Sequence, residues 1–349
     1  MTPGPTLALA GLLPDQIVEN LSLEPAFRGT QIFGWIHRGA PDFSHMTDLP
    51  SELRARLAGS AAVATTAVAR RHDAPDGSTK LRILLADGAF VETMCLADPN
   101  GRRTACLSTQ SGCAMGCAFC RTGLMGLARD LEAHEIVEQF LHLAREAGSV
   151  DNVVFMGMGE PFRNWESTAR AIEVLRHPEG TGMGVRRITV STCGIPAGIL
   201  RLAEEGPDVK LAVSLVTADQ DSRASLMPVA RAHPLAELKD ALIAYQRARR
   251  HRITLEIVLL AGLTDRDRDA DALLRFIPPL RAMVNLIPWN PVPEIGFSEP
   301  SRERVLRFEE RLARAGVPVT RRVGKGRGIL GACGQLAVLQ DRADPADAR

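Results

Sequence analysis

From residue 104 onward, short apolar runs alternate with longer segments in which apolar residues recur every three to four positions. The short runs predict strands and the periodic segments predict amphipathic helices. The expected strands are Ala105–Thr109, Asn152–Met156, Arg187–Ser191, Lys210–Leu215, Arg252–Leu260 and Met283–Pro288. The expected helices include Leu131–Ala147, Trp165–Leu175, Leu235–Arg249, Asp269–Phe276 and Arg302–Ala315.

This alternation predicts six β–α units in one run, and therefore a parallel sheet with right-handed crossovers. The fold class is α/β, and six strands favour a partial (β/α)6 barrel of TIM type. Barrels of this type carry their chemistry at the carboxyl ends of the strands.

The part of the chain before the barrel has a different pattern. Residues 14–58 are typical of helices, and residues 61–95 alternate like strands, with turn signals at Asp76-Gly77 and Asp87-Gly88. We therefore expect a small α+β domain over residues 1–95 and the barrel over residues 96–340, followed by a charged tail over 341–349.

Composition changes this picture little. The 349 residues are 45% hydrophobic and 24% charged, with a net charge of +1, as in an ordinary globular protein. This net charge neither requires nor excludes nucleic acid. Local clusters of arginine are more suggestive of RNA, although most such runs are solvated faces. Seven cysteines, an odd number, favour a reducing compartment over a disulfide framework. No apolar run reaches membrane-spanning length and no signal peptide precedes the first helix, so we expect a cytoplasmic protein.

Three of the cysteines, Cys113, Cys117 and Cys120, have the spacing Cys-x3-Cys-x2-Cys directly after the first barrel strand. Three thiolates on one tight loop can hold three irons of a 4Fe–4S cluster. The fourth iron is then open to the amino and carboxylate groups of S-adenosylmethionine (SAM). This is the radical-SAM signature, and it predicts a radical-SAM barrel with one cluster. The alternative is a zinc site, but structural zinc has four ligands and no fourth Cys or His lies at short range.

Small polar residues and glycines follow several barrel strands. Gly159 and Glu160 follow the second strand, where glycine lets a ligand approach the backbone and the carboxylate can accept from an amino or hydroxyl group. Ser191, Ser214 and Asn290 end the third, fourth and sixth strands. Each alone is more often a cap or turn residue. Together, at one rim, they favour hydrogen bonds to SAM.

Two further cysteines and a carboxylate have informative positions. Cys333 lies in a glycine-rich, basic segment, where nearby cations favour the thiolate. Cys106 lies seven residues before the cluster motif. Glu92 lies in a strand of the front domain, facing either inward or outward. Cys95 and Cys193 have no such context and are expected to fill the core.

At this point the chain resembles the RlmN/Cfr family, the radical-SAM methyltransferases that modify an adenine of large-subunit ribosomal RNA. The resemblance extends over nearly the whole chain. Its motifs are Trp35 to Gly39, Met46 to Leu49, Val91 to Thr93, Cys106 to Gly112, the three cluster cysteines, Met156 to Pro161, Ser191-Thr192, Ser214-Leu215, Asn285 to Pro291 and Ala332 to Leu336.

The resemblance implies a methyl relay that uses two molecules of SAM per turnover. The first methylates the cysteine matching Cys333, and cleavage of the second leads to loss of hydrogen from that methyl group. The resulting carbon adds to the adenine ring. The thiol matching Cys106 then releases the product by forming a disulfide with Cys333, and Glu92 matches the proton acceptor. Gly159, Glu160, Ser191, Ser214 and Asn290 match SAM contacts.

The resemblance also implies partners: 23S ribosomal RNA, held with the help of the front domain, and a reductase or flavodoxin as electron donor to a monomeric enzyme. The sequence of residues 156–161, Met-Gly-Met-Gly-Glu-Pro, resembles the RlmN branch of the family and favours carbon 2 of adenine over carbon 8. The alternatives are a relative that acts on another RNA, including transfer RNA, a non-catalytic iron–sulfur or RNA-binding protein, and an enzyme acting on a small molecule. The first remains open. The second would not need both Cys106 and Cys333, and the third would not need the front domain.

The chain departs from the family in two places. Val216 occupies the position of a usual His after the Ser-Leu pair, which removes a polar contact to SAM. Residues 327–331, Arg-Gly-Ile-Leu-Gly, replace an acidic pattern before Cys333. We expect Arg327 to contact RNA phosphate, because phosphate contacts add affinity without reading sequence.

Overall fold

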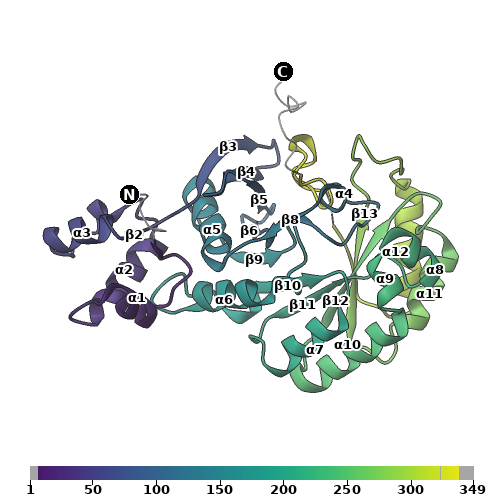
Figure 1. Cartoon of the computed structure of the whole chain (residues 1–349). Coiled ribbons are helices and arrows are strands. Elements are labelled where there is room, and N and C mark those ends of the chain that lie inside the picture. Colours follow the sequence, from purple (N-terminus) through teal and green to yellow (C-terminus); the bar gives the residue numbers. More distant parts are fainter. Residues whose placement is uncertain (1–6, 323, 338–349) are drawn as a thin grey trace.

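The computed structural model describes residues 7–322 and 324–337 (Figure 1). The expected tail over 341–349 lies outside these ranges, as does the end of the expected barrel, residues 338–340. No helix within the described ranges combines the length and the apolar character that crossing a membrane requires.

Six parallel strands form the centre of one 10-stranded sheet and coincide with the six predicted strands. They pair in sequence order. Their bounds are β6 (Arg103–Cys106), β9 (Asn152–Phe155), β10 (Ile188–Thr192), β11 (Lys210–Ser214), β12 (Ile253–Leu259) and β13 (Ala282–Pro288). The α/β fold with a partial (β/α)6 barrel is confirmed. A short strand that the sequence did not predict, β14 (Val319–Arg321), adds in parallel to β13.

Helices follow the strands and cover the outside of the sheet (Figure 1). The predicted helices are present and are joined by several shorter ones. The helices are α5 (Ala133–Ala147), α6 (Trp165–Arg176), α7 (Pro196–Glu204), α8 (Gln220–Leu226), α9 (Val229–Ala232), α10 (Leu235–Arg249), α11 (Asp267–Phe276) and α12 (Arg302–Arg314), with the 3-10 turn η2 (Val185–Arg187).

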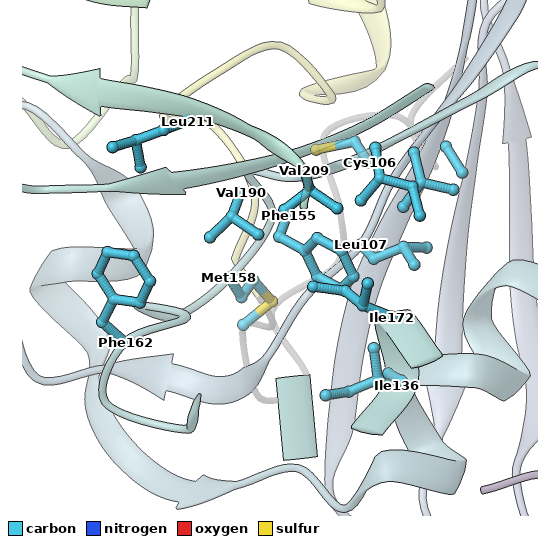
Figure 2. Close-up of a cluster of buried hydrophobic side chains, with 14 of the residues drawn as sticks. Cys106, Leu107, Ile136, Phe155, Met158, Phe162, Ile172, Val190, Val209 and Leu211 are labelled. Carbon is cyan, nitrogen blue, oxygen red and sulfur yellow. The ribbon is translucent and has the colours of Figure 1, made fainter. Parts of the chain in front are cut away.

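The core between helices and strands is apolar and closely packed. Figure 2 shows Phe155 and Val190 of neighbouring strands beside Ile136 of α5 and Ile172 of α6. All four side chains are buried, with at most 1% of their surface exposed. Burial of such side chains stabilises the fold by about 1.5–3 kcal/mol each. This packing explains why the strands are nearly continuous apolar runs: a parallel sheet is covered by helices.

The front of the chain has the expected α+β composition. Its helical part contains α1 (Pro14–Leu21), α2 (Phe27–His37), the 3-10 turn η1 (Phe43–His45) and α3 (Ser51–Ala58), which lie at one end of the molecule in Figure 1. Two short strands, β1 (Leu7–Ala8) and β2 (Ala61–Ala62), pair beside them.

The front strands continue the barrel sheet. The antiparallel strands β3 (Ala67–Asp73), β4 (Thr79–Leu84) and β5 (Phe90–Ala97) are added in reverse order of sequence, and β5 pairs with β6. In that pairing Met94 lies opposite Cys106. The expected boundary between residues 95 and 96 thus falls inside β5. Periodicity cannot show which strands pair, so this continuation was not visible in the sequence.

Candidate active site

A cavity of about 1030 Å³ lies at the carboxyl ends of the parallel strands. This is where a barrel is expected to carry its chemistry. It is lined by all but one of the residues that the sequence singled out: Cys106, Cys113, Cys117, Cys120, Gly159, Glu160, Ser191, Ser214, Asn290 and Cys333. The exception is Glu92. Segments more than two hundred residues apart in the chain therefore meet in one space.

The loop with the three cysteines is built on a hairpin that the sequence did not reveal. Strand β7 (Gln110–Cys113) pairs with β8 (Gly126–Asp130), and α4 (Arg121–Met125) lies between them. Gly112 has a φ of +80°, and a Cβ there would lie 2.0 Å from the carbonyl oxygen of Gly126. Glycine is required because the two strands approach too closely for a side chain. The hairpin fixes Cys113, and the turn holds the other two thiols near it.

The three thiols are held in an environment that disfavours their charged form. Burial raises the pKa of Cys113 to about 11 and also raises the pKa values of Cys117 and Cys120. The charges of Cys120 and then Cys113 raise the pKa of Cys117 further. Thiolates placed in this way need positive ions among them, since a metal replaces the protons.

This donor set, three thiolates on one loop, fits an iron–sulfur cluster. Within the described ranges, no three His, Cys, Asp or Glu side chains converge on one ion position. The thiolates of a cluster instead bind different irons. Cys113, Cys117 and Cys120 would hold such a cluster.

The polar residues expected to bind SAM lie around the same cavity. Gly159 has a φ of +100°, and a Cβ there would lie 2.6 Å from the Cβ of Gln110. The Glu160 carboxylate accepts hydrogen bonds from the backbone N–H of Cys193 at 2.7 Å and of Phe162 at 3.1 Å. Burial raises the pKa of Glu160. The carboxylate is thus fixed in place by donors of the protein.

Cys193 belongs to the buried core, as expected, and has a further role at the cavity. It is buried, but it lines the cavity and donates its backbone N–H to Glu160. Its place directly after Ser191-Thr192, at the end of a barrel strand, was the sequence signal for this position.

The side chain of Val216 lies away from the cavity lining. It is fully buried, has a φ of +68°, and donates its backbone N–H to the carbonyl of Glu256 at 3.0 Å. Positive φ is uncommon for a β-branched residue. This hydrogen bond holds the backbone at the end of the strand. The histidine that the family usually has at this position is replaced by an apolar side chain.

Asn290 has a different set of partners from those expected. Its Nδ2 donates to the carbonyl oxygen of Cys333 at 3.1 Å, and its Oδ1 accepts from Nε of Arg327 at 2.7 Å. The side chain therefore connects the end of β13 to the segment that carries Cys333. It lines the cavity, but its amide is occupied by the protein.

Cys106 and Cys333 face the cavity as neighbours, and both are free thiols. Burial and, after it, the charge of Cys333 raise the pKa of Cys106, and Arg322 lowers it; the result of these effects is a pKa of about 12. Cys106 at neutral pH is therefore a protonated thiol whose ionisation depends on these two neighbours.

Arg322 and Glu256 are site residues that the sequence analysis missed. The pKa of Arg322 is raised first by the charge of Cys333, then by Glu256 and Cys106. Burial raises the pKa of Glu256, which accepts from Nδ2 of Asn285 at 2.8 Å. Arg322 belongs to a local cluster of arginine in the sequence, and such clusters are typical of exposed faces. A glutamate inside an apolar barrel strand was the available signal.

Glu92 faces inward, which settles the orientation that the sequence left open. It is 5% exposed. Its Oε1 lies 3.0 Å from Nζ of Lys80, and its Oε2 accepts from the backbone N–H of Ala337 at 3.0 Å. A buried carboxylate requires such partners. Glu92 thus lies behind the cavity wall and holds the chain that follows Cys333.

Two family models match the chain. One, described as Radical SAM superfamily, matches residues 107–274. The other, described as Ribosomal RNA large subunit methyltransferase N-terminal domain, matches residues 18–63 in the front part. The two matches together cover the cluster loop, most of the barrel strands and the N-terminal helices.

Relatives match over almost their full length. The probable dual-specificity RNA methyltransferase RlmN of Treponema pallidum (strain Nichols) is 50% identical over 94% of this chain and 97% of the relative. The dual-specificity RNA methyltransferase RlmN of Sorangium cellulosum (strain So ce56) is 40% identical over 94% of each. A crystal structure of a radical SAM methyltransferase from Sphaerobacter thermophilus has a TM-score of 0.91 and 44% identity, covering 95% of this chain and 99% of that one. The chain therefore belongs to the RlmN family of radical-SAM methyltransferases.

Proposed function

We propose that this protein methylates carbon 2 of an adenine in 23S ribosomal RNA by a methyl relay through Cys333. The observation that carries the proposal is the meeting of Cys333 and Cys106 in the cavity that also contains the three cluster cysteines. A radical-SAM enzyme that transferred methyl groups directly would not need this thiol pair.

Cys113, Cys117 and Cys120 hold the cluster, which when bound supplies the electron for reductive cleavage of SAM. Gly159, Glu160, Ser191 and Ser214 hold SAM at the strand ends, and Asn290 acts on this site through the Cys333 segment. Cys333 takes up a methyl group from one SAM. Cleavage of a second SAM leads to loss of hydrogen from that methyl group, so two molecules of SAM are used per turnover.

Cys106 releases the product. Its thiolate attacks the sulfur of Cys333, so the S–S bond forms as the bond between that sulfur and the transferred carbon breaks. The electron pair remains on the nucleotide and is protonated. Glu92 accepts the proton that leaves the ring, and the one electron that the ring must also lose would go to the cluster. Lys80 supplies the positive charge that the buried carboxylate needs. Division of a difficult substitution into such covalent steps is the advantage of nucleophilic catalysis.

RNA is supported as the substrate by the names of the relatives; the cavity wall itself carries basic and acidic side chains in equal number. Arg102, Arg321, Arg322 and Lys325 are among the lining residues. Basic side chains of this kind bind phosphate irrespective of base sequence. The domain over residues 1–95 would assist in binding RNA. We further propose a monomeric, cytoplasmic enzyme that receives electrons from a reductase or flavodoxin.

A second candidate is methylation of another RNA site, an adenine of transfer RNA or carbon 8 of adenine. The description of relatives as dual-specificity enzymes favours a second RNA target. Mass spectrometry of nucleosides from ribosomal and transfer RNA of a deletion strain, with and without complementation, distinguishes these outcomes. Loss of 2-methyladenosine from 23S RNA supports the main proposal, and loss of a different methylated base replaces it.

The relay has its own test in the protein. In cluster-loaded enzyme we expect S-methylation of Cys333, and in Cys106→Ala we expect a covalent protein–RNA adduct, because no thiol releases the product. Peptide mass spectrometry detects both. Cys95→Ala, a buried thiol outside the cavity lining, is the matched control and should form no adduct. An unmodified Cys333 during turnover would exclude the relay.

A further inference from the structure

The segment that carries Cys333 contains an arginine with an unusual number of protein partners. Arg327 begins the 3-10 turn η3 (Arg327–Ile329). Its Nε donates to Oδ1 of Asn290 at 2.7 Å, and its Nη2 donates to Oε1 of Glu299 at 2.7 Å. Weaker contacts join Nη1 to Oε2 of Glu299 at 3.3 Å and Nη2 to the carbonyl of Trp289 at 3.4 Å. The guanidinium expected to bind RNA phosphate is thus engaged inside the protein.

Arg327 determines how the Asn290 amide is turned. Asn290 is 2% exposed, so both ends of its amide need partners. A guanidinium only donates hydrogen bonds, so the amide oxygen must face Arg327. The NH2 group then faces the carbonyl of Cys333, to which it donates at 3.1 Å. By fixing the orientation of the Asn290 amide, Arg327 therefore also fixes the hydrogen bond to the backbone of Cys333.

The chain leaves space for this contact. A Cβ on Gly324 would lie 2.3 Å from Oδ1 of Asn290 and 2.5 Å from Nε of Arg327. No side chain larger than hydrogen fits there without separating the two groups. The hydrogen bond between Arg327 and Asn290 therefore depends on the glycine at position 324.

The exposure of the ion pair decides what kind of role it can have. The side chains of Arg327 and Glu299 are 37% and 39% exposed. Such pairs add little to folding stability, because water screens them. An effect of Arg327 is therefore expected on the position of Cys333 and not on the stability of the protein.

We infer that Arg327 is a positioning residue: with Glu299 as its counter-ion, it orients Asn290 and thereby holds Cys333 beside Cys106. The inference rests on the proposed function in one respect, that Cys106 and Cys333 form a disulfide during the reaction. It assigns to Arg327 a task different from binding RNA. It also places Asn290 in the control of Cys333 and not in direct contact with SAM.

The test is the equilibrium between the two thiols and their disulfide, which requires neither RNA nor turnover. Full-length, cluster-loaded protein with unmethylated Cys333 is equilibrated anaerobically with reduced and oxidised glutathione. One glutathione disulfide is reduced to two thiols for each Cys106–Cys333 bond formed. Trapping with acid and peptide mass spectrometry give the equilibrium constant, and iron content and the thermal unfolding midpoint are measured on the same samples.

We expect Arg327→Gln to lower this equilibrium constant by roughly tenfold, because small misplacement of reacting groups reduces their effective concentration strongly. Arg327→Lys should recover it only in part, since an ammonium group lacks the planar set of donors that reaches both partners. Iron content and unfolding midpoint should not change. Arg307→Gln, which removes a surface pair with Asp267, is the control and should leave the equilibrium unchanged.

The outcomes separate the two proposals. If the wild-type protein forms no Cys106–Cys333 disulfide, the release step of the proposed function fails, and the inference fails with it. If the wild type forms the disulfide and Arg327→Gln forms it equally well, the proposed function stands and the positioning role is overturned. An equal loss in Arg307→Gln would also overturn it.

Discussion

Two cysteine-bearing loops meet in the active site, and they are built in different ways. The cluster loop, residues 113–120, takes its shape first from neighbours in sequence: the hairpin β7–β8 and the close approach of Gly112 to Gly126. Two bonds to remote residues add to this, from the N–H of Ala118 to the carbonyl of Leu226 at 2.9 Å and from Nε1 of Trp289 to the carbonyl of Phe119 at 3.0 Å. The relay loop, residues 324–336, is held by remote parts of the chain. Gly326 donates its N–H to Asp76 at 2.8 Å, and Gln335 donates to the carbonyl of Pro291 at 2.8 Å.

The two loops are also joined to each other. Arg121 donates its backbone N–H to the carbonyl of Gly334 at 2.8 Å, and Oγ1 of Thr122 donates to the carbonyl of Leu336 at 2.5 Å. A local loop thus serves as part of the support for a loop that has little support of its own. The comparison teaches that loss of distant contacts should disturb the position of Cys333 more than it disturbs the cluster.

The largest effect is expected from Cys113→Ala. Removal of one of three thiolates should abolish cluster binding, because each thiolate holds one iron of the cluster. Iron and sulfide analysis after anaerobic reconstitution measures this. Cys193→Ala removes a thiol beside the same cavity and should retain iron. Stoichiometric zinc in the wild-type protein would contradict the cluster assignment.

Cys106 should be strongly protected from alkylation by its environment. Its pKa of about 12 leaves roughly a thousandfold less thiolate at neutral pH than a thiol of pKa 9. A raised pKa favours the neutral thiol, so alkylation by iodoacetamide should rise about tenfold per pH unit, with no plateau below pH 9. Isotopic labelling with peptide mass spectrometry gives the rate.

Variants of two neighbours of Cys106 are the controls for the pH dependence of its alkylation. Cys333→Ala should lower the pKa of Cys106 and accelerate its alkylation, because a like charge is removed. Arg322→Gln should slow it, because a positive charge is lost. A plateau near the pKa of an ordinary thiol would show that burial does not govern this site.

Lys80→Met should destabilise the protein by about 3–5 kcal/mol, because it removes the ammonium group that lies 3.0 Å from the buried carboxylate of Glu92. Urea unfolding measures the free energy. The double variant Lys80→Met/Glu92→Leu should recover much of the loss. Iron content of the folded fraction should remain that of the wild type; a parallel loss of iron would contradict the independence of the cluster loop. Lys239→Met, on an outer helix, should change stability little.

The smallest effect is expected from Thr122→Val, which removes the hydrogen bond between the two loops. A net loss of about 1 kcal/mol is expected for one hydrogen bond, and the cluster should remain bound. Hydrogen exchange at residues 334–336 should become faster. Ser225→Ala, which removes an exposed hydroxyl on α8, is the matched control. Unchanged exchange at 334–336 would show that Thr122 does not hold the relay loop.

Much of the barrel was predictable, because the spacing of apolar residues along the chain follows directly from which side chains are buried. All six parallel strands were found within a few residues of their bounds, and so were the long helices α5, α10 and α12. The hairpin β7–β8 was not found, since Gln110–Cys113 has no apolar alternation. Helix α7, which contains Gly198, was also missed. Both elements were missed because the local pattern of their residues is weak beside the stronger motif that adjoins each of them.

The sequence by itself determined the cluster loop and the list of residues around the cavity, because the spacing of Cys113, Cys117 and Cys120 is local. It could not determine partners. Pairing of β5 with β6, the inward turn of Glu92 onto Lys80, and the bonds from Asn290 to Cys333 and Arg327 join residues remote in sequence. Only tertiary structure decided these, because a side chain's role depends on which donors and charges folding brings within hydrogen-bond distance.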